Sequence, residues 1–119
     1  MKSITRLIEG VTIVQISGRI ELGEASAAVR ELVHDLLAKG RKKILLNLAD
    51  VDYIDSAGLG SLVSAFTSAQ KEGGVLKLVY LTKKVHDLLQ MTKLYTVFEI
   101  VENEEEAIKS FDKSAASSA

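Results

Sequence analysis

The sequence predicts a single α/β domain with a mostly parallel sheet of four to five strands, an antiparallel edge and about four covering helices. Two observations support this fold class. Short apolar runs typical of strands alternate with amphipathic patterns typical of helices, and such alternation produces right-handed crossovers between parallel strands. The chain has 119 residues and 47% apolar composition, which suits one domain with a sizeable core.

The first twenty residues supply the start of the sheet. Polar and apolar residues alternate over residues 1–10, and we expect this leading segment to form the antiparallel edge. Val11–Ile16 is rich in β-branched residues and is followed by Gly18, so the sequence predicts an edge or half-buried strand that ends there. The strands that follow should be parallel.

A helix and two buried strands come next in the alternation. Glu24–Lys39 places its apolar residues at helical spacing and stops before Gly40, which suits the position after a helix C-terminus. Lys42–Leu48 and Val75–Leu81 are short apolar runs of the kind that a parallel sheet buries on both faces. A helix is expected between them.

Three more helices and one more strand complete the prediction. They are a helix with an apolar stripe from Leu59 to Gly73–Gly74, a short helix capped by Thr82 and running to Gln90, a strand at Thr96–Val101 and a helix at Glu104–Phe111. The small and polar residues at the end of the chain have nothing to bury. We therefore expect a domain over residues 1–112 and a disordered C-terminal tail over residues 113–119.

Composition excludes several classes of function. A formal net charge of -1 and a pI near 6.1 argue against the cationic surface that nucleic-acid binding requires. The chain has no cysteine for disulfides or thiolate metal sites. Residues 1–10 lack the apolar core of a signal peptide, and no apolar run approaches the roughly 20 residues of a membrane span. We expect a cytoplasmic protein with no nucleic-acid partner and no direct membrane insertion.

The stretch Asp55–Ser61, DSAGLGS, does not match the common nucleotide-binding or catalytic motifs. A dinucleotide-binding fingerprint would need a third glycine at Val63, and the Gly-Lys-Ser or Gly-Lys-Thr of a P-loop occurs nowhere. A hydrolase nucleophile elbow would need glycine at Ile54, two residues before Ser56. We therefore expect no enzymatic activity and no cofactor.

The acidic residues around this stretch do not form a recognisable metal site. Asp50, Asp52 and Asp55 have the spacing of metal ligands, but a calcium loop needs Asp or Asn at Ile54 and glycine at position 55. The two histidines are His34 and His86. Each falls in a predicted helix among charged neighbours, where a histidine is usually a solvated surface residue. We expect neither a bound metal nor a catalytic histidine.

Two interpretations of Asp55–Ser61 remain. A solvated loop with Asp55 or Ser56 as helix cap accounts for its polar residues. Gly58 and Gly60, however, each weaken a first helical turn by about 1 kcal/mol relative to alanine, so a docking surface that needs close approach explains them better. The preceding loop, residues 49–55, should emerge at the C-terminal ends of the strands, where ligands bind in such sheets. A phosphate on Ser56 could be held there by the helix N-terminus.

The stretch NLADVDYIDSAGLGSLV, residues 47–63, resembles the signature of the STAS domain, the family of sulfate-transporter domains and anti-sigma-factor antagonists. The resemblance covers nearly the whole chain. VTIVQISGRIE, residues 11–21, is similar to the family's second strand and turn, and residues 81–108 are similar to its late helix, strand and closing helix. The family's fold is thus expected here.

The resemblance to the antagonist branch implies a phosphorylation switch. In that branch, an anti-sigma factor with serine kinase activity phosphorylates the serine directly after the aspartate, here Ser56, and a metal-dependent serine phosphatase reverses the reaction. The unphosphorylated antagonist binds the anti-sigma factor and releases the sigma factor, whereas the phosphorylated form lets go. The protein would be a substrate and ligand rather than an enzyme. The expected partner-binding residues are Glu21, Asp52, Asp55, Ala57, Gly58, Leu59, Gly60 and Ser61.

Two positions depart from the branch, and other functions compete. Glu21 stands where an aspartate is usual and keeps the carboxylate, and Ala57 stands where many relatives have a second serine.

The alternative function is a non-phosphorylated STAS subunit of a membrane transport complex. Nucleotide binding or hydrolysis is a third possibility, but no phosphate-cradling loop supports it. Retention of Ser56 favours the antagonist.

Overall fold

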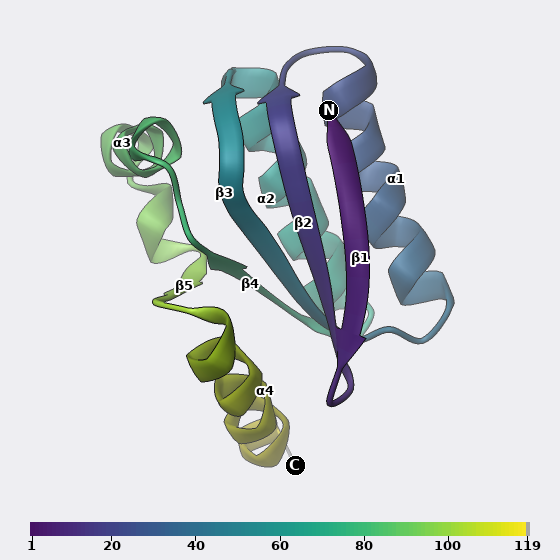
Figure 1. Cartoon of the computed structure of the whole chain (residues 1–119). Coiled ribbons are helices and arrows are strands. Elements are labelled where there is room, and N and C mark those ends of the chain that lie inside the picture. The colour runs from purple at the N-terminus through teal and green to yellow at the C-terminus, as the bar shows by residue number, and fades with distance from the viewer. Residues whose placement is uncertain (119) are drawn as a thin grey trace.

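The computed structural model describes residues 1–118, with the side chains of residues 1–112. These residues form five β-strands, four α-helices and one short 3₁₀ helix (Figure 1). In chain order the elements are β1 (Lys2–Ile8), β2 (Val11–Ile20), α1 (Glu24–Ala38), β3 (Lys43–Ile54), α2 (Ser56–Lys71), β4 (Val75–Val79), α3 (Lys83–Thr92), η1 (Leu94–Thr96), β5 (Glu99–Val101) and α4 (Glu104–Ser118). The predicted α/β fold class is confirmed.

The five strands lie side by side in the order β1-β2-β3-β4-β5. β1 is antiparallel to β2, and every other neighbouring pair is parallel. The hairpin between β1 and β2 turns through Glu9 and Gly10, whose φ angles are 50° and 81°. A two-residue turn with positive φ at both positions matches the twist of the strands that it joins. The prediction that the leading segment forms an antiparallel edge is therefore confirmed.

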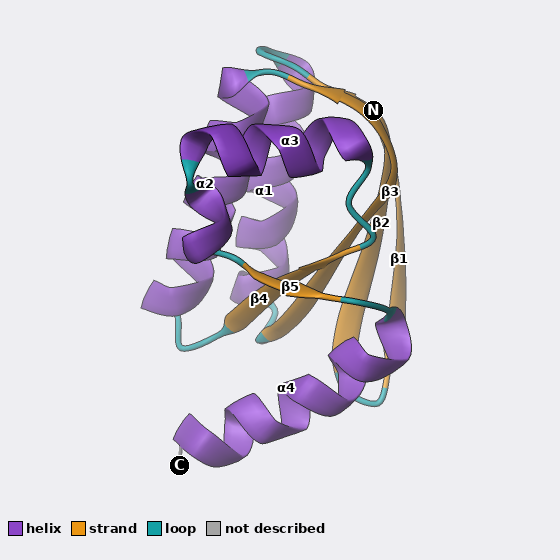
Figure 2. Ribbon diagram, turned by 90° about the vertical axis from the view of Figure 1, so that its left-hand side faces the viewer, coloured by secondary structure: helices purple, strands orange, loops and turns teal. Residues whose placement is uncertain are grey.

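Helices cover both faces of the sheet. On one face, α1, α2 and α3 pack on buried side chains of β2, β3 and β4 and form the larger hydrophobic cluster (Figure 2). On the other face, Ala107 and Phe111 of α4 pack against Val11, Ile13 and Leu45 in a smaller cluster. Alternate residues of a strand point to opposite faces, so β2 and β3 contribute to both clusters.

β3 is longer than the sequence predicts. The expected strand ends at Leu48 and is followed by a loop over residues 49–55, whereas β3 continues to Ile54. Its pairing with β2 shifts register twice, before Ser17 and after Gly18. Each shift adds one residue to β3 and breaks the alternation of buried and exposed positions that marks a strand in sequence. The loop prediction is wrong for this reason, and β2 likewise continues past Gly18.

Elements in the C-terminal half differ from the prediction mainly in length. Thr82 caps α3 as expected, because its hydroxyl oxygen accepts a 3.4 Å hydrogen bond from the amide of Val85. The strand predicted at Thr96–Val101 is reduced to β5, because residues 94–96 form η1.

Within residues 1–118, every helix is too short or too polar to cross a membrane.

The last helix extends beyond its predicted end. The sequence predicts a helix to Phe111 and a disordered tail over residues 113–119, but α4 continues to Ser118. Extending an existing helix through alanine and serine requires no new nucleation, which is the unfavourable step in helix formation. Residue 119 lies outside the described residues, and a domain boundary after residue 112 stays a prediction.

Candidate functional site

The stretch Asp55–Ser61 lies at the C-terminal edge of the parallel strands, where β3 leads directly into α2 (Figure 1). Asp55 follows the last residue of β3 with an extended backbone (φ −105°, ψ −176°), and Ser56 is the first residue of α2. The prediction that this stretch lies at a helix N-terminus is confirmed, although α2 begins before Leu59. The N–H groups of a first helical turn therefore lie next to the Ser56 hydroxyl.

The carboxylate of Asp55 joins two segments of the chain. Its Oδ1 accepts a 2.8 Å hydrogen bond from the amide of Gly58, and its Oδ2 accepts a 3.0 Å bond from the amide of Leu22, in the loop after β2. These two hydrogen bonds stabilise the ionised carboxylate and lower the pKa of Asp55, and the bond from Gly58 has the larger effect. Asp55 is thus the helix cap, and the Ser56 side chain is not needed for capping.

Gly58 is required by the fold itself. A Cβ atom at this position would lie 2.0 Å from the carbonyl oxygen of Ile20 and 2.9 Å from Cγ1 of Ile54. The close approach that the sequence suggests at this glycine therefore takes place inside the molecule, between the start of α2 and the end of β2. Ser61 supports the same turn, because its buried hydroxyl donates a 2.6 Å hydrogen bond to the Gly58 carbonyl.

The eight predicted partner-binding residues divide into two groups. Three of them, Gly58, Leu59 and Ser61, are buried on the inward side of the first turns of α2. They face inward because the helix returns to the same side every three to four residues. The remaining five reach solvent, and they are Glu21, Asp52, Asp55, Ala57 and Gly60. Ser56 is also exposed.

Gly60 is the outward counterpart of Gly58. It is exposed, and no atom lies within 4 Å of a Cβ added there. Nothing in the described part of the chain therefore requires glycine at this position. The fold requires glycine at position 58 but not at position 60. Only Gly60 is therefore available to serve a function such as close packing against a partner.

Glu21 lies beside residues Asp55–Ser61, which we call the Ser56 segment. It directly precedes Leu22, whose amide binds Asp55, and its own carbonyl accepts a 3.1 Å hydrogen bond from Ser26 at the start of α1. Leu22 itself is 79% exposed. The loop after β2 is thus fixed to the start of α2 by its backbone while its side chains face solvent.

A cationic and aromatic cluster beside this edge was not predicted from the sequence. Arg19 Nε donates a 2.6 Å hydrogen bond to Glu21 Oε1, and the Arg19 guanidinium lies 4.1 Å from the centre of the Tyr53 ring. Lys84 of α3 places its Nζ 5.3 Å from the same ring centre. The hydrogen bond with Glu21 raises the pKa of Arg19. This cluster depends on the pairing of Arg19 with Tyr53 across β2 and β3, which no sequence pattern indicates.

The aspartates that resembled metal ligands have different surroundings. Asp50 Oδ2 accepts a 2.7 Å hydrogen bond from Gln15 Nε2, Asp55 caps α2, and Asp52 is exposed. Among residues 1–118, no three histidine, aspartate or glutamate side chains are grouped so that they could hold a metal ion. Both histidines are exposed.

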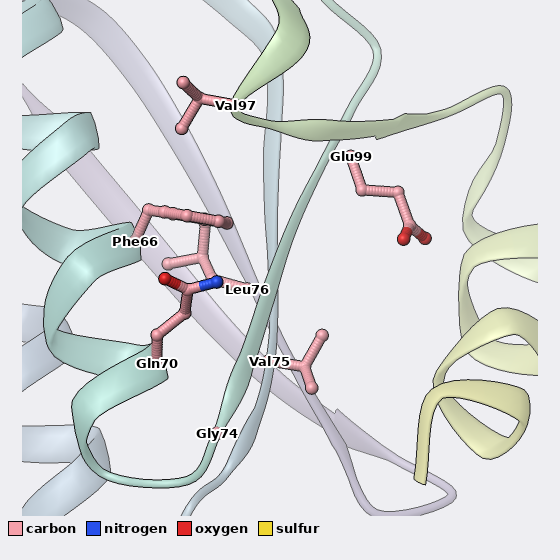
Figure 3. Close-up of a pocket in the computed structure, with 7 residues that line it drawn as sticks. All are labelled: Phe66, Gln70, Gly74, Val75, Leu76, Val97 and Glu99. Carbon is pink, nitrogen blue, oxygen red and sulfur yellow. The ribbon is translucent and has the colours of Figure 1, made fainter. Parts of the chain in front are cut away.

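A small cavity lies away from this site. It has a volume of about 220 Å³ (Figure 3). The residues that line it include Phe66 and Gln70 of α2, Val75 at the start of β4, Val97 just before β5 and Glu99 in β5. Ser56 is at the other end of α2, which has 16 residues and is therefore about 24 Å long. The cavity is therefore separate from the Ser56 segment.

Comparison with known proteins gives a consistent result. The STAS domain profile matches residues 2–107. The anti-sigma-B factor antagonist of Bacillus subtilis strain 168 is 36% identical over 87 residues, which cover 73% of this chain and 78% of that protein. A crystal structure of a candidate anti-sigma factor antagonist from Thermotoga maritima has a TM-score of 0.84 and 30% identity, and covers 92% of this chain and 94% of that one.

A more distant structure shares the fold. The Bacillus cell fate determinant SpoIIAA in its phosphorylated form has a TM-score of 0.70 at 17% identity, covering 92% of this chain and 98% of that one. At this identity the likeness concerns the fold alone.

Proposed function

Because the chain belongs to the STAS domain family and its relatives include anti-sigma factor antagonists, we propose that it is an antagonist switched by phosphorylation in a partner-switching pathway. The unphosphorylated protein binds an anti-sigma factor with serine kinase activity and thereby releases a sigma factor. Phosphorylation of Ser56 by this kinase ends the binding, and a metal-dependent serine phosphatase restores it. The protein acts in the cytoplasm as a substrate and ligand rather than as an enzyme.

The position of Ser56 is the observation that supports this proposal most strongly. Its side chain is exposed at the first position of α2, and the neighbouring Asp55 already fills the capping role. A kinase can therefore reach the hydroxyl without unfolding the helix. A phosphate added there lies at the positive end of the helix dipole, which favours an anion by typically 0.3–1 kcal/mol.

The same phosphate opposes association with a partner. It brings about −1.5 to −2 charges at neutral pH next to the Asp55 carboxylate. A partner that packs against Ala57 and Gly60 would have to bury this charge, which costs several kcal/mol without a matching cation. The unfavourable desolvation exceeds the favourable helix dipole, so binding is lost while the fold is kept.

The partner-binding surface consists of the five solvent-accessible residues around Ser56. Ala57 and Gly60 allow close packing, Asp52 and Asp55 supply negative charge, and Glu21 helps to position the kinase or its metal-bound nucleotide. The inward residues Gly58, Leu59 and Ser61 act indirectly, because they hold α2 against the end of β2.

A pull-down with matched variants tests the proposal. Wild-type protein and Ser56→Ala should both recover an ATPase of the kinase type, and purified kinase should phosphorylate wild type and Ser3→Ala but not Ser56→Ala. Ser3 serves as the control because it is an exposed serine in β1, outside the proposed site. Recovery of only transporter subunits, with no phosphorylation of Ser56, would instead support a structural STAS subunit of a membrane transport complex.

A further inference from the structure

The outer edge of β1 is an open edge of the sheet. β1 is the terminal strand on its side, and it pairs with β2 over all seven of its residues without a register shift (Figure 1). Every residue of the strand except Arg6 is exposed. Proteins usually protect such an edge with proline, a bulge or free charges, because its unpaired N–H and C=O groups can pair with another strand.

These protective features are weak in β1. The chain contains no proline, and the strand has no bulge. The charge of Arg6 is matched within the molecule, because its guanidinium lies 2.6 Å from the Glu104 carboxylate of α4. Lys2, at the beginning of the strand, is the other charged residue. The middle of the edge is therefore free to pair.

Exposed aliphatic side chains occupy the same strand. Ile4 is 64% exposed, Leu7 54% and Ile8 36%. Residues two apart share a face, so Ile4 and Ile8 lie on the face of Arg6 and α4, while Leu7 lies on the face of α1. The edge thus combines free backbone groups with apolar side chains above and below the sheet.

We propose that β1 is a self-association site, where the β1 strands of two copies of this chain pair in antiparallel orientation about a two-fold axis at Thr5. In this register Ile4 of one copy lies opposite Arg6 of the other, Ser3 lies opposite Leu7, and Lys2 lies opposite Ile8. The aliphatic stems of the lysine and arginine side chains can cover the isoleucines while the charged groups stay in water. All seven residues of each strand take part.

The charges of the strand restrict the register in which two copies can pair. A two-fold axis at Ile4 would place Lys2 opposite Arg6, and an axis at Arg6 would place two arginines opposite each other. Like charges in directly opposite positions destabilise a strand pair. The Thr5 axis has no such pair and is the one axis that pairs all seven residues of the strand. Axes at Ser3 or Leu7 also avoid like charges, but each pairs only three residues of the strand.

This association leaves the Ser56 segments open and does not depend on their proposed role. Because the two β1 strands are antiparallel, the C-terminal edges of the parallel strands in the two copies point in opposite directions. The two five-stranded sheets would join into one continuous sheet, in which the two Ser56 segments lie at opposite strand-end edges.

Cysteine cross-linking tests the register, because the chain has no native cysteine. Directly opposite residues have Cα atoms about 4.5–5.5 Å apart, within the range that a disulfide spans. Thr5→Cys should form a disulfide dimer on mild oxidation. Ser3→Cys and Leu7→Cys should cross-link when mixed but not alone. Thr67→Cys, at an exposed threonine of α2, is the matched control and should form no disulfide dimer.

A charge substitution tests the strength of the association. Thr5→Lys places two lysines opposite each other and should raise the dimer dissociation constant at least tenfold in sedimentation equilibrium, whereas Thr67→Lys should not change it. Circular dichroism checks that each variant is folded. Wild-type protein that stays monomeric up to millimolar concentration, or cross-linking of Thr5→Cys no faster than that of Thr67→Cys, would overturn the proposal. An edge that captures only unrelated strands while the protein stays monomeric would overturn it as well.

Discussion

The inward and outward sides of the first turns of α2 contain the same small residues for different reasons. On the inward side, Gly58 lies so close to the Ile20 carbonyl that no side chain fits, and Ser61 hydrogen-bonds to the same turn. On the outward side, Gly60 has open space around it and Ser56 is exposed. A sequence motif can thus combine residues that the fold requires with residues that the fold does not explain, and only contacts separate them.

The largest expected effect is that of Gly58→Ala. The added methyl group would meet a backbone oxygen at 2.0 Å, and the strands that hold this oxygen cannot move without disturbing the core. Overpacking costs typically 1–3 kcal/mol, and we expect about 3 kcal/mol here. Urea unfolding measures this loss. A stability equal to that of wild type would show that the inward side does not depend on close approach.

Gly60→Ala should have a smaller effect of opposite sign. Alanine is favoured over glycine in a helix by up to about 1 kcal/mol, and the site has room for its methyl group. Urea unfolding should therefore show a gain in stability. If a partner packs closely on this side, the same variant should bind more weakly than wild type. Unchanged binding would remove Gly60 from the proposed surface.

Asp55→Asn should change how stability depends on pH. The hydrogen bonds from Gly58 and Leu22 lower the pKa of Asp55 in the folded protein, so the ionised carboxylate stabilises the fold above the unfolded value, ordinarily about 3.9. That contribution is lost as the pH falls through the folded pKa. Asparagine can still accept the Gly58 bond but has no second oxygen for Leu22.

The melting temperatures of wild type and Asp55→Asn should therefore differ at neutral pH and converge as the solution becomes acidic. Asp52→Asn is the control, because it removes an exposed carboxylate outside the cap. A gap between wild type and Asp55→Asn that stays constant over the acidic range would argue against the capping carboxylate as its source.

The smallest effect on stability is expected for Glu21→Ala. Its ion pair with Arg19 is exposed, and such pairs add little to stability. The melting temperature should stay nearly the same, whereas phosphorylation of Ser56 by the kinase should slow. Arg19→Ala is the matched control because it breaks the ion pair but keeps the carboxylate. Phosphorylation of Glu21→Ala at the wild-type rate would exclude a positioning role for Glu21.

Periodicity in the sequence predicted the fold but not the contacts of the site. The alternation of apolar runs is enough to predict the mixed sheet, and the position of Thr82 before an apolar helical pattern predicts its role as a cap. The second half of β3 was missed because two bulges interrupt its alternation. The reason for Gly58 was missed because its neighbour, Ile20, is far away in the sequence and is brought near only by the sheet.

The sequence also could not show which of the predicted site residues are buried and which reach solvent. Spacing predicted a helix N-terminus at Asp55–Ser61, but which side of that helix faces the core depends on how α2 is placed against β2 and β3. Leu59 and Ser61 are buried for this reason, although the sequence analysis includes both among the expected partner-binding residues. Arg19 and Tyr53 meet only through strand pairing, so their cluster was beyond sequence reasoning.

The most direct test of the account is to measure partner affinity and thermal unfolding on one sample of protein phosphorylated at Ser56. We expect affinity for the anti-sigma factor to fall more than tenfold, equivalent to about 1.4 kcal/mol, with little change in melting temperature. Ser56→Asp should reproduce the loss only in part, because it has one charge on a shorter side chain. Loss of affinity together with collapse of the fold would contradict the mechanism. Equal affinity of the phosphorylated and unphosphorylated forms would contradict the switch itself.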